Sequence, residues 1–350
     1  MNRRAALKAF LATALISFAS TGWASAQDGP TVGMSWANYQ EERWKIDEEG
    51  LRARLEEMGG ELIATDAQSS SSKQASDIEN LLTRGVDVLM IVAQDAGAVM
   101  PAVQAALDEG VPVVAYERQI EHPELTYVAF DPIKVGRIQA RALVEAQPSG
   151  RYALIKGSPT DQYTFYVLEG QREIIDPLIE AGDIEIVGEQ FTDGWAPTNA
   201  QTNMEGILTA NDNDVDAVLA ANDGTAGGVV AALRAVGLDG TVPVSGQDGD
   251  IAALNRIAGG SQTVTAWKDA RALGAKAADV AKALADGVDP ATLDGALAWT
   301  KGPEGIEQTA VVLAPVAITR DNLEVVVNAG WIGKDELCRD LPGAAPAICE

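Results

Sequence analysis

Histidine is almost absent from this sequence, because His122 is the only one among 350 residues. Imidazole is the side chain most often used for proton transfer near neutral pH and for binding transition metals. Its scarcity argues against a Ser/His/Asp triad and against a His-rich metal site. His122 itself lies in the segment Glu121-His122-Pro123, which is typical of a solvated turn. We therefore expect no enzyme activity, no cofactor and no metal.

Other signatures of catalysis or phosphate binding are also missing. No Gly-x-Gly-x-x-Gly follows the first predicted strand, where Gly33 stands alone, and there is neither a Walker loop nor a Gly-x-Ser-x-Gly turn. Asp212-x-Asp214-x-Asp216 resembles the start of a calcium loop, but no glycine follows Asp216 and the twelfth position is Asp223 rather than Glu. Asp216 also falls within a predicted strand, so we interpret Asn211–Asp214 as a solvated turn.

Positive charge is scarce, with 26 Lys and Arg against 51 Asp and Glu, and the formal net charge is −25. Nucleic acids and anionic membrane surfaces bind clustered Lys and Arg. Neither is therefore an expected partner. Phe and Tyr are few, at five and six, whereas seven Trp are present. Indole rings offer flat apolar faces on which the C–H face of a sugar can pack.

Residues 1–26 have the features of a secretory signal peptide. A basic start is followed by a short apolar stretch and by the small residues Ala24-Ser25-Ala26. The apolar stretch is too short for a transmembrane anchor, which needs about 20 residues. Cleavage after Ala26 removes three basic residues and no acidic ones, so the net charge falls from −25 to −28. The expected location is a bacterial periplasm, reached through general secretion or, because of Arg3-Arg4, through twin-arginine export.

The two cysteines, Cys338 and Cys349, enclose a loop rich in Pro, Ala and Gly near the end of the chain. An exported protein can form disulfides, and a bond here would hold the tail of residues 336–350 in place. A two-cysteine metal site is the alternative, but no His or third Cys lies nearby. The sequence predicts a disulfide.

Short β-branched apolar runs alternate with helical patterns along the rest of the chain, which indicates an α/β fold with parallel sheets. Helical spacing of apolar residues is clearest over 42–58, 98–109, 133–146 and 224–235. The predicted strands are Thr31–Ser35, Glu61–Thr65, Val86–Val92, Pro112–Tyr116, Thr126–Phe130, Tyr152–Lys156, Ile184–Glu189, Val215–Ala221, Val242–Ser245 and Thr263–Trp267.

A faint internal repeat divides this pattern into two halves. Val86-Asp87-Val88-Leu89 is followed by a helix and Val111-Pro112-Val113-Val114, while Val215-Asp216-Ala217-Val218-Leu219 is followed by a helix and Val242-Pro243-Val244. Two similar βαβ units favour two Rossmann-like lobes over one long sheet. Each lobe would be a parallel sheet flanked by helices, with the boundary near Asp131–Pro132.

Polar or indole side chains follow six of the predicted strands, at the point where each strand ends. In open α/β sheets, ligands bind beyond the carboxyl ends of the strands. Each residue also has a simpler interpretation, such as a helix cap for Asp223 or Asp250 and a surface charge for Arg43 or Lys268. The residues that follow the strands are Glu117, Arg118, Asp161, Trp195, Asn222, Gln247, Asp248 and Lys268.

The chemistry of this set suits an uncharged polyol. A sugar hydroxyl both donates and accepts, so Asp, Asn and Arg together can satisfy it in a cleft without water. Trp44 and Trp195 could cover the two apolar faces of a sugar ring. A phosphate or carboxylate ligand would need more cations and fewer carboxylates.

At these residues the mature chain resembles the periplasmic sugar-binding proteins of ABC transporters, in the type I, ribose-binding-like family, and in particular its D-xylose-binding members. The motifs that carry the resemblance are Glu42-Arg43-Trp44, Gln74 to Asp87, Ala115-Tyr116-Glu117-Arg118, Gly157-Ser158-Pro159-Thr160-Asp161, Asp193-Gly194-Trp195, Asn222-Asp223 and Ser245-Gly246-Gln247-Asp248.

The resemblance implies two lobes joined by three hinge crossings, which close on one monosaccharide, D-xylose or a related pentose. The expected N-terminal lobe is 27–132 plus 268–302, and the expected C-terminal lobe is 133–267 plus 303–335. Trp44 and Trp195 would stack on the sugar ring. The residues expected to hydrogen-bond its hydroxyls are Arg43, Arg118, Asp161, Asn222, Asp248 and Lys268, with Glu117 beside them.

Two positions depart from the xylose pattern. Glu117 stands where the family usually has Asp, which extends the carboxylate by one methylene. Gln162-Tyr163 replaces an Asn-Asn pair and so exchanges an amide for an aromatic ring. Another pentose, a hexose or a sugar alcohol therefore stays open as the ligand.

Three other classes of function remain as alternatives. A sugar-responsive repressor has this fold, but it would begin with a helix-turn-helix and bind DNA, for which −28 is unsuitable. An exported α/β enzyme lacks a recognisable nucleophile–base pair. A receptor for a sugar, polyol or signal molecule could serve chemotaxis or sensing rather than uptake. We expect a monomer that delivers its ligand to the membrane permease of an ABC importer, with a chemoreceptor as the partner in the sensing alternative.

Overall fold

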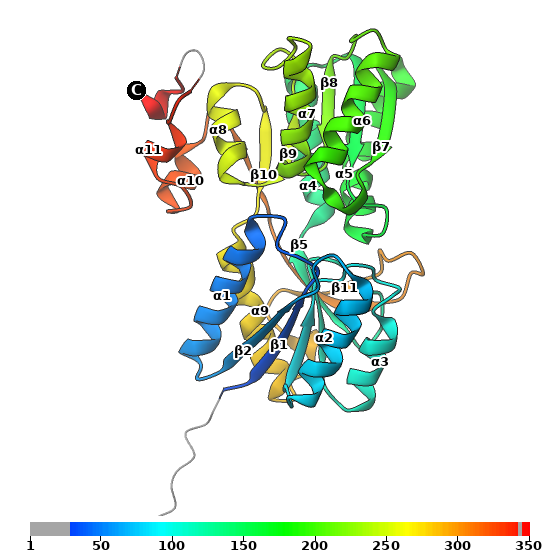
Figure 1. Ribbon diagram of the computed structural model, residues 1–350, viewed down its shortest axis with the longest axis vertical. Coiled ribbons are helices and arrows are strands. Elements are labelled where there is room, and N and C mark those ends of the chain that lie inside the picture. Colours follow the sequence, from blue (N-terminus) through cyan, green and yellow to red (C-terminus); the bar gives the residue numbers. More distant parts are fainter. Residues whose placement is uncertain (1–28, 342–344) are drawn as a thin grey trace, which may run out of the picture.

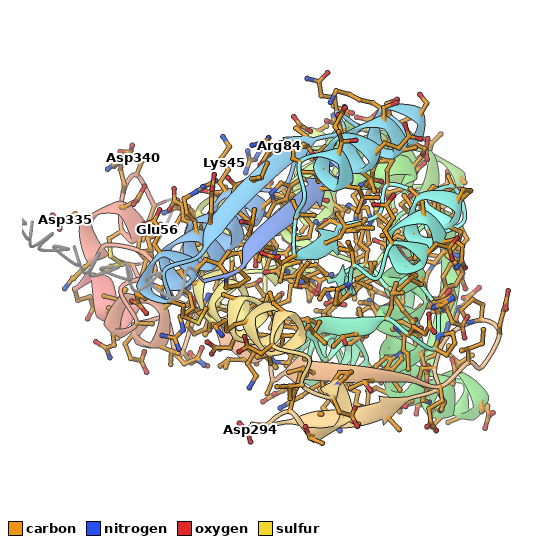
Figure 2. The ribbon with its side chains drawn as sticks, turned by 90° about the horizontal axis from the view of Figure 1, so that it is seen from below. Lys45, Glu56, Arg84, Asp294, Asp335 and Asp340 are labelled. Carbon is orange, nitrogen blue, oxygen red and sulfur yellow. A yellow bond between two sulfur atoms is a disulfide. The ribbon has the colours of Figure 1, made fainter. Side chains whose placement is uncertain are left out.

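The computed structural model describes residues 29–341 and 345–350, in two lobes (Figure 1). The expected signal peptide, residues 1–26, lies outside the described residues. Within the described part of the chain, no helix is long and apolar enough to cross a membrane. Charged side chains such as Lys45, Glu56 and Asp294 point outward from the ribbon (Figure 2). Unpaired charged side chains are rarely buried in an apolar core.

The first lobe is built on a seven-stranded sheet in the order β11-β12-β5-β4-β3-β1-β2. All pairs in it are parallel except the edge pair β11–β12. The strands are β1 (Thr31–Trp36), β2 (Glu61–Asp66), β3 (Val88–Ile91), β4 (Val113–Tyr116), β5 (Thr126–Phe130), β11 (Ala296–Trp299) and β12 (Gln308–Leu313).

Alternate residues of these strands enter two apolar cores, one on each face of the sheet. Val88 and Met90 pack under α1 (Arg43–Glu57) and α9 (Ala270–Ala285). Leu89 and Ile91 pack under α2 (Ser71–Thr83) and α3 (Met100–Asp108). Because both faces of these strands are buried, their sequences are continuous apolar runs rather than alternating apolar and polar residues.

Helices α1 and α9 approach each other closely because glycines lie at their crossing. A Cβ atom on Gly274 would lie 2.3 Å from the Asp47 carbonyl oxygen, and one on Gly50 would lie 2.7 Å from the Arg271 carbonyl oxygen. Only glycine fits at either position. This contact sets the position of α1, whose first turn faces the other lobe.

The second lobe contains two three-stranded sheets, β7-β6-β8 and β13-β10-β9, joined by a single parallel bridge between Val218 and Val244. The pair β10–β13 is antiparallel and the others are parallel. The strands are β6 (Gly150–Lys156), β7 (Ile184–Phe191), β8 (Ala217–Ala220), β9 (Ser245–Asp248), β10 (Val264–Trp267) and β13 (Val316–Thr319).

Helices again cover both faces. Tyr152 and Leu154 of β6 pack against α4 (Pro132–Ala146) and α5 (Gln162–Ala181). Ala153 and Ile155, on the opposite face, pack against α6 (Pro197–Ala210) and α7 (Asp223–Ala235). The predicted α/β fold with two Rossmann-like lobes is therefore confirmed, with one antiparallel strand added at an edge of each lobe.

The chain crosses between the lobes three times: from β5 to α4 at Asp131, from β10 to α9 at 268–269, and from β12 to β13 at 314–315. The prediction that the third crossing lies near Gly302, with 303–335 in the C-terminal lobe, is wrong for residues 303–313. Strand β12 pairs with β5 in the first sheet, with Thr309 opposite Thr126. In chain order β12 thus comes after β6 to β10 of the second lobe, so no local pattern reveals its pairing with β5.

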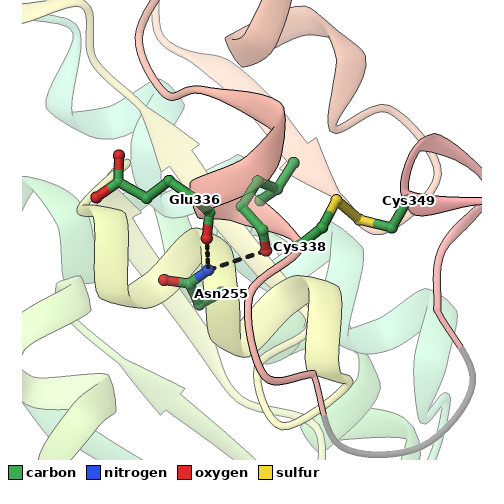
Figure 3. The surroundings of a disulfide bond; sticks show 5 residues. Asn255, Glu336, Cys338 and Cys349 are labelled. Atoms are coloured by element: carbon green, nitrogen blue, oxygen red, sulfur yellow. Dashed lines mark hydrogen bonds between the residues drawn. A yellow bond between two sulfur atoms is a disulfide. The ribbon is translucent and has the colours of Figure 1, made fainter.

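The C-terminal tail packs on the second lobe. Helices α10 (Glu324–Asn328) and α11 (Lys334–Leu337) share an apolar cluster with α8 (Ile251–Gly259), in which Leu337 is fully buried. The predicted disulfide is confirmed: Cys338 and Cys349 are bonded, with their Cα atoms 5.5 Å apart (Figure 3). The bond closes the tail against α8.

Candidate functional site

A cavity lies between the two lobes, with about 310 Å³ of empty space that includes part of the open solvent at its mouth. All nine residues predicted to bind the ligand line it. The full lining is Glu41, Arg43, Trp44, Glu117, Arg118, Asp161, Tyr163, Trp195, Asn222, Gln247, Asp248 and Lys268.

Sequence reasoning left three lining residues outside the predicted binding set. Gln247 was recognised only as a polar residue near a strand end, and Tyr163 only as a departure from the family pattern. Glu41 gave no signal of its own, although it lies two residues before Arg43, at the start of α1. The prediction of strand Val242–Ser245 was also displaced, because β9 is Ser245–Asp248 and so carries Gln247 and Asp248 within it.

Both lobes supply the cavity from the carboxyl ends of strands and the amino ends of helices. In the first lobe, Arg43 and Trp44 form the first turn of α1, and Glu117 follows β4. In the second lobe, Asp161 caps α5, accepting a hydrogen bond from the Tyr163 backbone N–H at 3.0 Å. Asn222, and not Asp223 as predicted, caps α7, because its side chain and that of Thr225 form a reciprocal capping box.

Arg43 is the centre of a buried charge cluster. It is 1% exposed, which rules out the solvated interpretation. Its guanidinium bonds Asp47 at 2.9 Å, bonds Glu117, and lies 3.6 Å from Asp248 of the other lobe. Burial alone would lower the pKa of Arg43, but the carboxylates of Asp47, Glu117 and Asp248 raise it well above its ordinary value. The guanidinium is thus charged and fully compensated.

Lys268, at the second crossing, completes this cluster. Its ammonium lies 2.9 Å from Asp248 and 3.3 Å from Glu117, and it donates to the Tyr163 hydroxyl at 3.3 Å. Burial disfavours the charged form of Asp248, but Lys268 and Arg43 outweigh burial and hold the pKa of that carboxyl below its ordinary value. Lys268 is therefore buried and paired, and is not a surface charge.

Arg118 bridges the two lobes across the cavity. Its Nε lies 3.2 Å from Asp161, and its Nη1 donates to the Ala93 carbonyl at 3.1 Å. Trp195 donates from Nε1 to the same Asp161 carboxylate at 3.1 Å. Burial raises the pKa of Asp161 even though Arg118 and these donors oppose the shift.

Three residues of the cavity have positive φ, where a side chain is strained: Glu117 at 57°, Trp195 at 58° and Asp248 at 105°. Such strain persists only where the surroundings hold it. For Glu117, the backbone N–H donates to Val128 at 2.8 Å, and the carbonyl accepts from Tyr127 Oη at 3.1 Å. With the backbone in this conformation, all three side chains line the cavity.

One acceptor of the cavity is unused by the protein. Glu117 Oε2 is buried and has no hydrogen-bond partner among the described residues. A buried carboxylate oxygen without a donor is costly, so this atom is suited to receive a hydrogen bond from a bound molecule. Trp44 and Trp195, which are 5% and 4% exposed, add apolar ring faces from opposite lobes.

The cavity can therefore bind a neutral molecule rich in hydroxyl groups. Its three cations, Arg43, Arg118 and Lys268, each contact at least one carboxylate, which leaves no uncompensated positive charge for an anion. None of the residues that line it is Ser, Thr, Cys or His, so it holds no ordinary nucleophile–base pair.

Comparison with known proteins assigns this architecture to a class. Residues 32–289 match the family model described as the periplasmic binding protein domain. The chain belongs to this family of periplasmic binding proteins, so the predictions of a binding protein rather than an enzyme, and of a periplasmic location, are confirmed.

Several individual proteins of known name or structure are similar to this chain over most of its length. The chain is 37% identical to the D-xylose-binding periplasmic protein of Escherichia coli, over 95% of this chain and 99% of that protein. It is 32% identical to a multiple sugar-binding periplasmic receptor of Rhizobium radiobacter, over 90% and 94% of the two chains. A carbohydrate transporter solute-binding protein from Chloroflexus aurantiacus, solved with D-glucose, superposes with a TM-score of 0.79 at 29% identity, covering 87% and 97%.

Asp223 is a further buried acid, which does not line the cavity. Asp223 Oδ2 accepts from the backbone N–H groups of Gly249 at 2.9 Å and Asp250 at 3.0 Å, and from Thr265 Oγ1 at 2.8 Å. Its Oδ1 accepts from Gln262 at 2.7 Å. Burial, reinforced by the nearby negative charge of Asp248, nevertheless raises the pKa of Asp223 to about 7.

This shift predicts a pH-dependent contribution to stability. An acid whose pKa is higher in the folded state binds its proton more strongly there, so its contribution declines as the pH rises from about 4, near the unfolded pKa, to about 7. Urea unfolding at several pH values should show the free energy of unfolding of wild type, relative to Asp223→Asn, falling by on the order of a few kcal/mol over this range. The exposed Asp294→Asn is the control for loss of one charge, and a wild-type-to-Asp223→Asn difference that does not vary with pH would contradict the assignment.

Proposed function

We propose that this protein binds D-xylose or a related pentose between its lobes and delivers it to the membrane permease of an ABC importer. The observation that carries the proposal is the charge-compensated cavity between the lobes, with an indole ring from each lobe. Neutral sugars match it, because they offer hydroxyl groups to the polar residues and C–H faces to the rings.

Within this proposal the predicted residues have distinct roles. Asp161 and Asp248 accept hydrogen bonds from hydroxyls, and the unpartnered Oε2 of Glu117 takes another. Trp44 and Trp195 stack on opposite faces of the ring. The donors to the sugar oxygens are Arg43, Arg118, Asn222 and Lys268.

Two observations favour a pentose over a hexose. The relative named for D-xylose binding spans nearly the whole chain. In addition, the ring of Tyr163 forms part of the cavity wall and is held there by its hydroxyl, which donates to Gln247 at 3.0 Å. An aromatic ring at this position takes space that the family's usual amide would leave for an exocyclic hydroxymethyl group.

Sensing is the second candidate function, because one relative at 32% identity is named a receptor for multiple sugars. Such a protein uses the same cavity and passes its closed form to a chemoreceptor instead of, or besides, a permease. Uptake of labelled xylose by cells with and without this chain separates the two outputs, since a pure sensor leaves uptake unchanged.

The lobes must close on the sugar, because ligand contacts from both lobes favour the closed arrangement. Several contacts already join them: Arg118 to Asp161 in the cavity, Gln40 to the Gly194 carbonyl at 3.1 Å, and Lys301 to Glu169 at 2.7 Å. We assign the hinge to the three crossings, which carry the chain between lobes without intervening helices.

The first prediction concerns ligand choice. Calorimetric titration against pentoses, hexoses and polyols should give the tightest binding with D-xylose or a related pentose. Asp248→Ala should weaken that binding by about 2–4 kcal/mol, because Lys268 and the sugar lose their shared acceptor. The exposed Asp108→Ala is the matched control and should bind normally. Normal binding by Asp248→Ala would refute the site assignment.

The second prediction concerns closure. Small-angle scattering should give a smaller radius of gyration at saturating sugar than without sugar. Tryptophan emission should shift because Trp195, wet when the lobes are apart, is covered when they close on the sugar. Trp195→Ala should weaken binding by about 1–3 kcal/mol through lost burial and stacking. Tight binding with unchanged scattering and emission would exclude hinge closure.

The third prediction concerns export. We propose cleavage after Ala26, which leaves Gln27 as the new terminus. The intact mass of protein recovered from its host's periplasm should correspond to loss of residues 1–26 and of two hydrogens at Cys338 and Cys349. A mass that still contains Met1 would contradict the cleavage.

A further inference from the structure

The chain is strained at two successive residues where β9 ends and the loop to α8 begins. Asp248 has φ 105° and Gly249 has φ 81°. A Cβ on Gly249 would lie 2.3 Å from Cδ1 of Trp267, so no larger residue fits there. Backbone in these regions reverts to commoner conformations unless neighbouring groups hold it. The position of the Asp248 carboxylate between Lys268 and Arg43 depends on that restraint.

Both polar groups of the Gly249 backbone are held. The N–H donates to Asp223 Oδ2 at 2.9 Å and to Thr265 Oγ1 at 3.1 Å, from inside the lobe. The carbonyl accepts from Nε1 of Trp331 at 2.6 Å. Trp331 is 82 residues away in sequence and belongs to the C-terminal tail, between α10 and α11. It does not line the cavity.

Trp331 is itself fixed on two sides. Its ring meets the edge of Trp267 at a centroid distance of 5.8 Å and an angle of 67°. The guanidinium of Arg271, just past the second hinge crossing, lies 5.2 Å from the ring centroid. Arg271 also donates to the carbonyls of Ala329 at 3.2 Å and Gly330 at 3.3 Å. The indole therefore has little freedom to leave Gly249.

Hydrogen bonds from Asn255 secure the tail to the helix that follows the loop, next to the disulfide that closes the end of the tail on itself. Asn255 of α8 donates to the carbonyls of Glu336 and Leu337, both at 2.9 Å, and Cys338, the next residue, is bonded to Cys349 (Figure 3). Helix α8 starts at Ile251, two residues after Gly249. The tail thus holds the loop through Trp331 and the helix behind it through Asn255.

We infer that Trp331 is a positioning residue for sugar binding: its indole N–H holds the Gly249 carbonyl and so keeps the Asp248 carboxylate in place. This inference rests on the proposed function, because Asp248 is taken as a ligand to the sugar. It gives the disulfide-closed tail a part in binding, beyond packing on the second lobe.

The test is Trp331→Phe, which keeps an aromatic ring against Trp267 and Arg271 but removes the donor. The dissociation constant for D-xylose should rise about threefold to tenfold, the usual effect of one neutral hydrogen bond. Ile332→Val is the matched control: it removes a methylene from the same tail cluster, leaves the indole in place, and should leave the constant unchanged. An unchanged constant in Trp331→Phe, or an equal rise in Ile332→Val, would overturn the inference.

Two further measurements distinguish positioning from packing. In an Asp248→Asn background, Trp331→Phe should have no added effect on the dissociation constant, because the residue through which it acts is already altered. A full additional effect would overturn the inference. In the sugar-free protein, hydrogen exchange at the Gly249 N–H should be faster in Trp331→Phe than in wild type and in Ile332→Val.

The exchange measurement needs no ligand and therefore separates two failures. If wild type binds none of the sugars tested, the proposed function fails, and the exchange rates alone decide whether Trp331 holds the loop. If wild type binds D-xylose but exchange at Gly249 is the same in all three proteins, the positioning role fails and the proposed function stands.

Discussion

The site depends on placing the guanidinium of Arg43 in a dry position between the lobes. A buried charge is tolerated only when carboxylates surround it, and here Asp47 and Glu117 of its own lobe do so, with Asp248 of the other lobe 3.6 Å away. The glycine-mediated contact of α1 with α9 fixes its helix, and the strained backbone of Glu117 brings the second carboxylate to it. The buried guanidinium would destabilise the fold without these carboxylates, and the buried carboxylates would do so without the guanidinium.

The pairing of each cavity cation with a carboxylate also favours a neutral ligand over an anionic one. Because Arg43, Arg118 and Lys268 are each in contact with a carboxylate, an anionic sugar would have to displace a protein carboxylate from its cation. A neutral sugar only adds hydrogen bonds to groups already in place, among them the free oxygen of Glu117. The same charges therefore confer selectivity without a dedicated barrier against anions.

Much of this arrangement could be predicted from the sequence, because polar residues at strand ends and helix starts converge in parallel α/β folds by topology alone. That rule, with the family motifs, identified residues as distant as Arg43 and Lys268. It could not place β12, whose partner β5 lies 183 positions earlier in the pairing of Thr309 with Thr126. Nor could it recognise Glu41, which lies five residues beyond the end of β1, or Trp331, which reaches the site only through the backbone of Gly249.

Strain explains why residues outside the cavity matter to it. Positive φ at Glu117, Trp195 and Asp248 means that the folded chain, before any ligand arrives, already holds side chains in conformations that an unrestrained loop would leave. Restraint applied in advance lowers the ordering cost of binding. Asp223 supplies part of this restraint by accepting hydrogen bonds from the backbone N–H groups of Gly249 and Asp250. In the first lobe, sheet residues supply this restraint to Glu117. In the second lobe Asp248 is the last residue of β9, and Gly249 after it is held from inside by Asp223 and Thr265 and from outside by Trp331 of the tail.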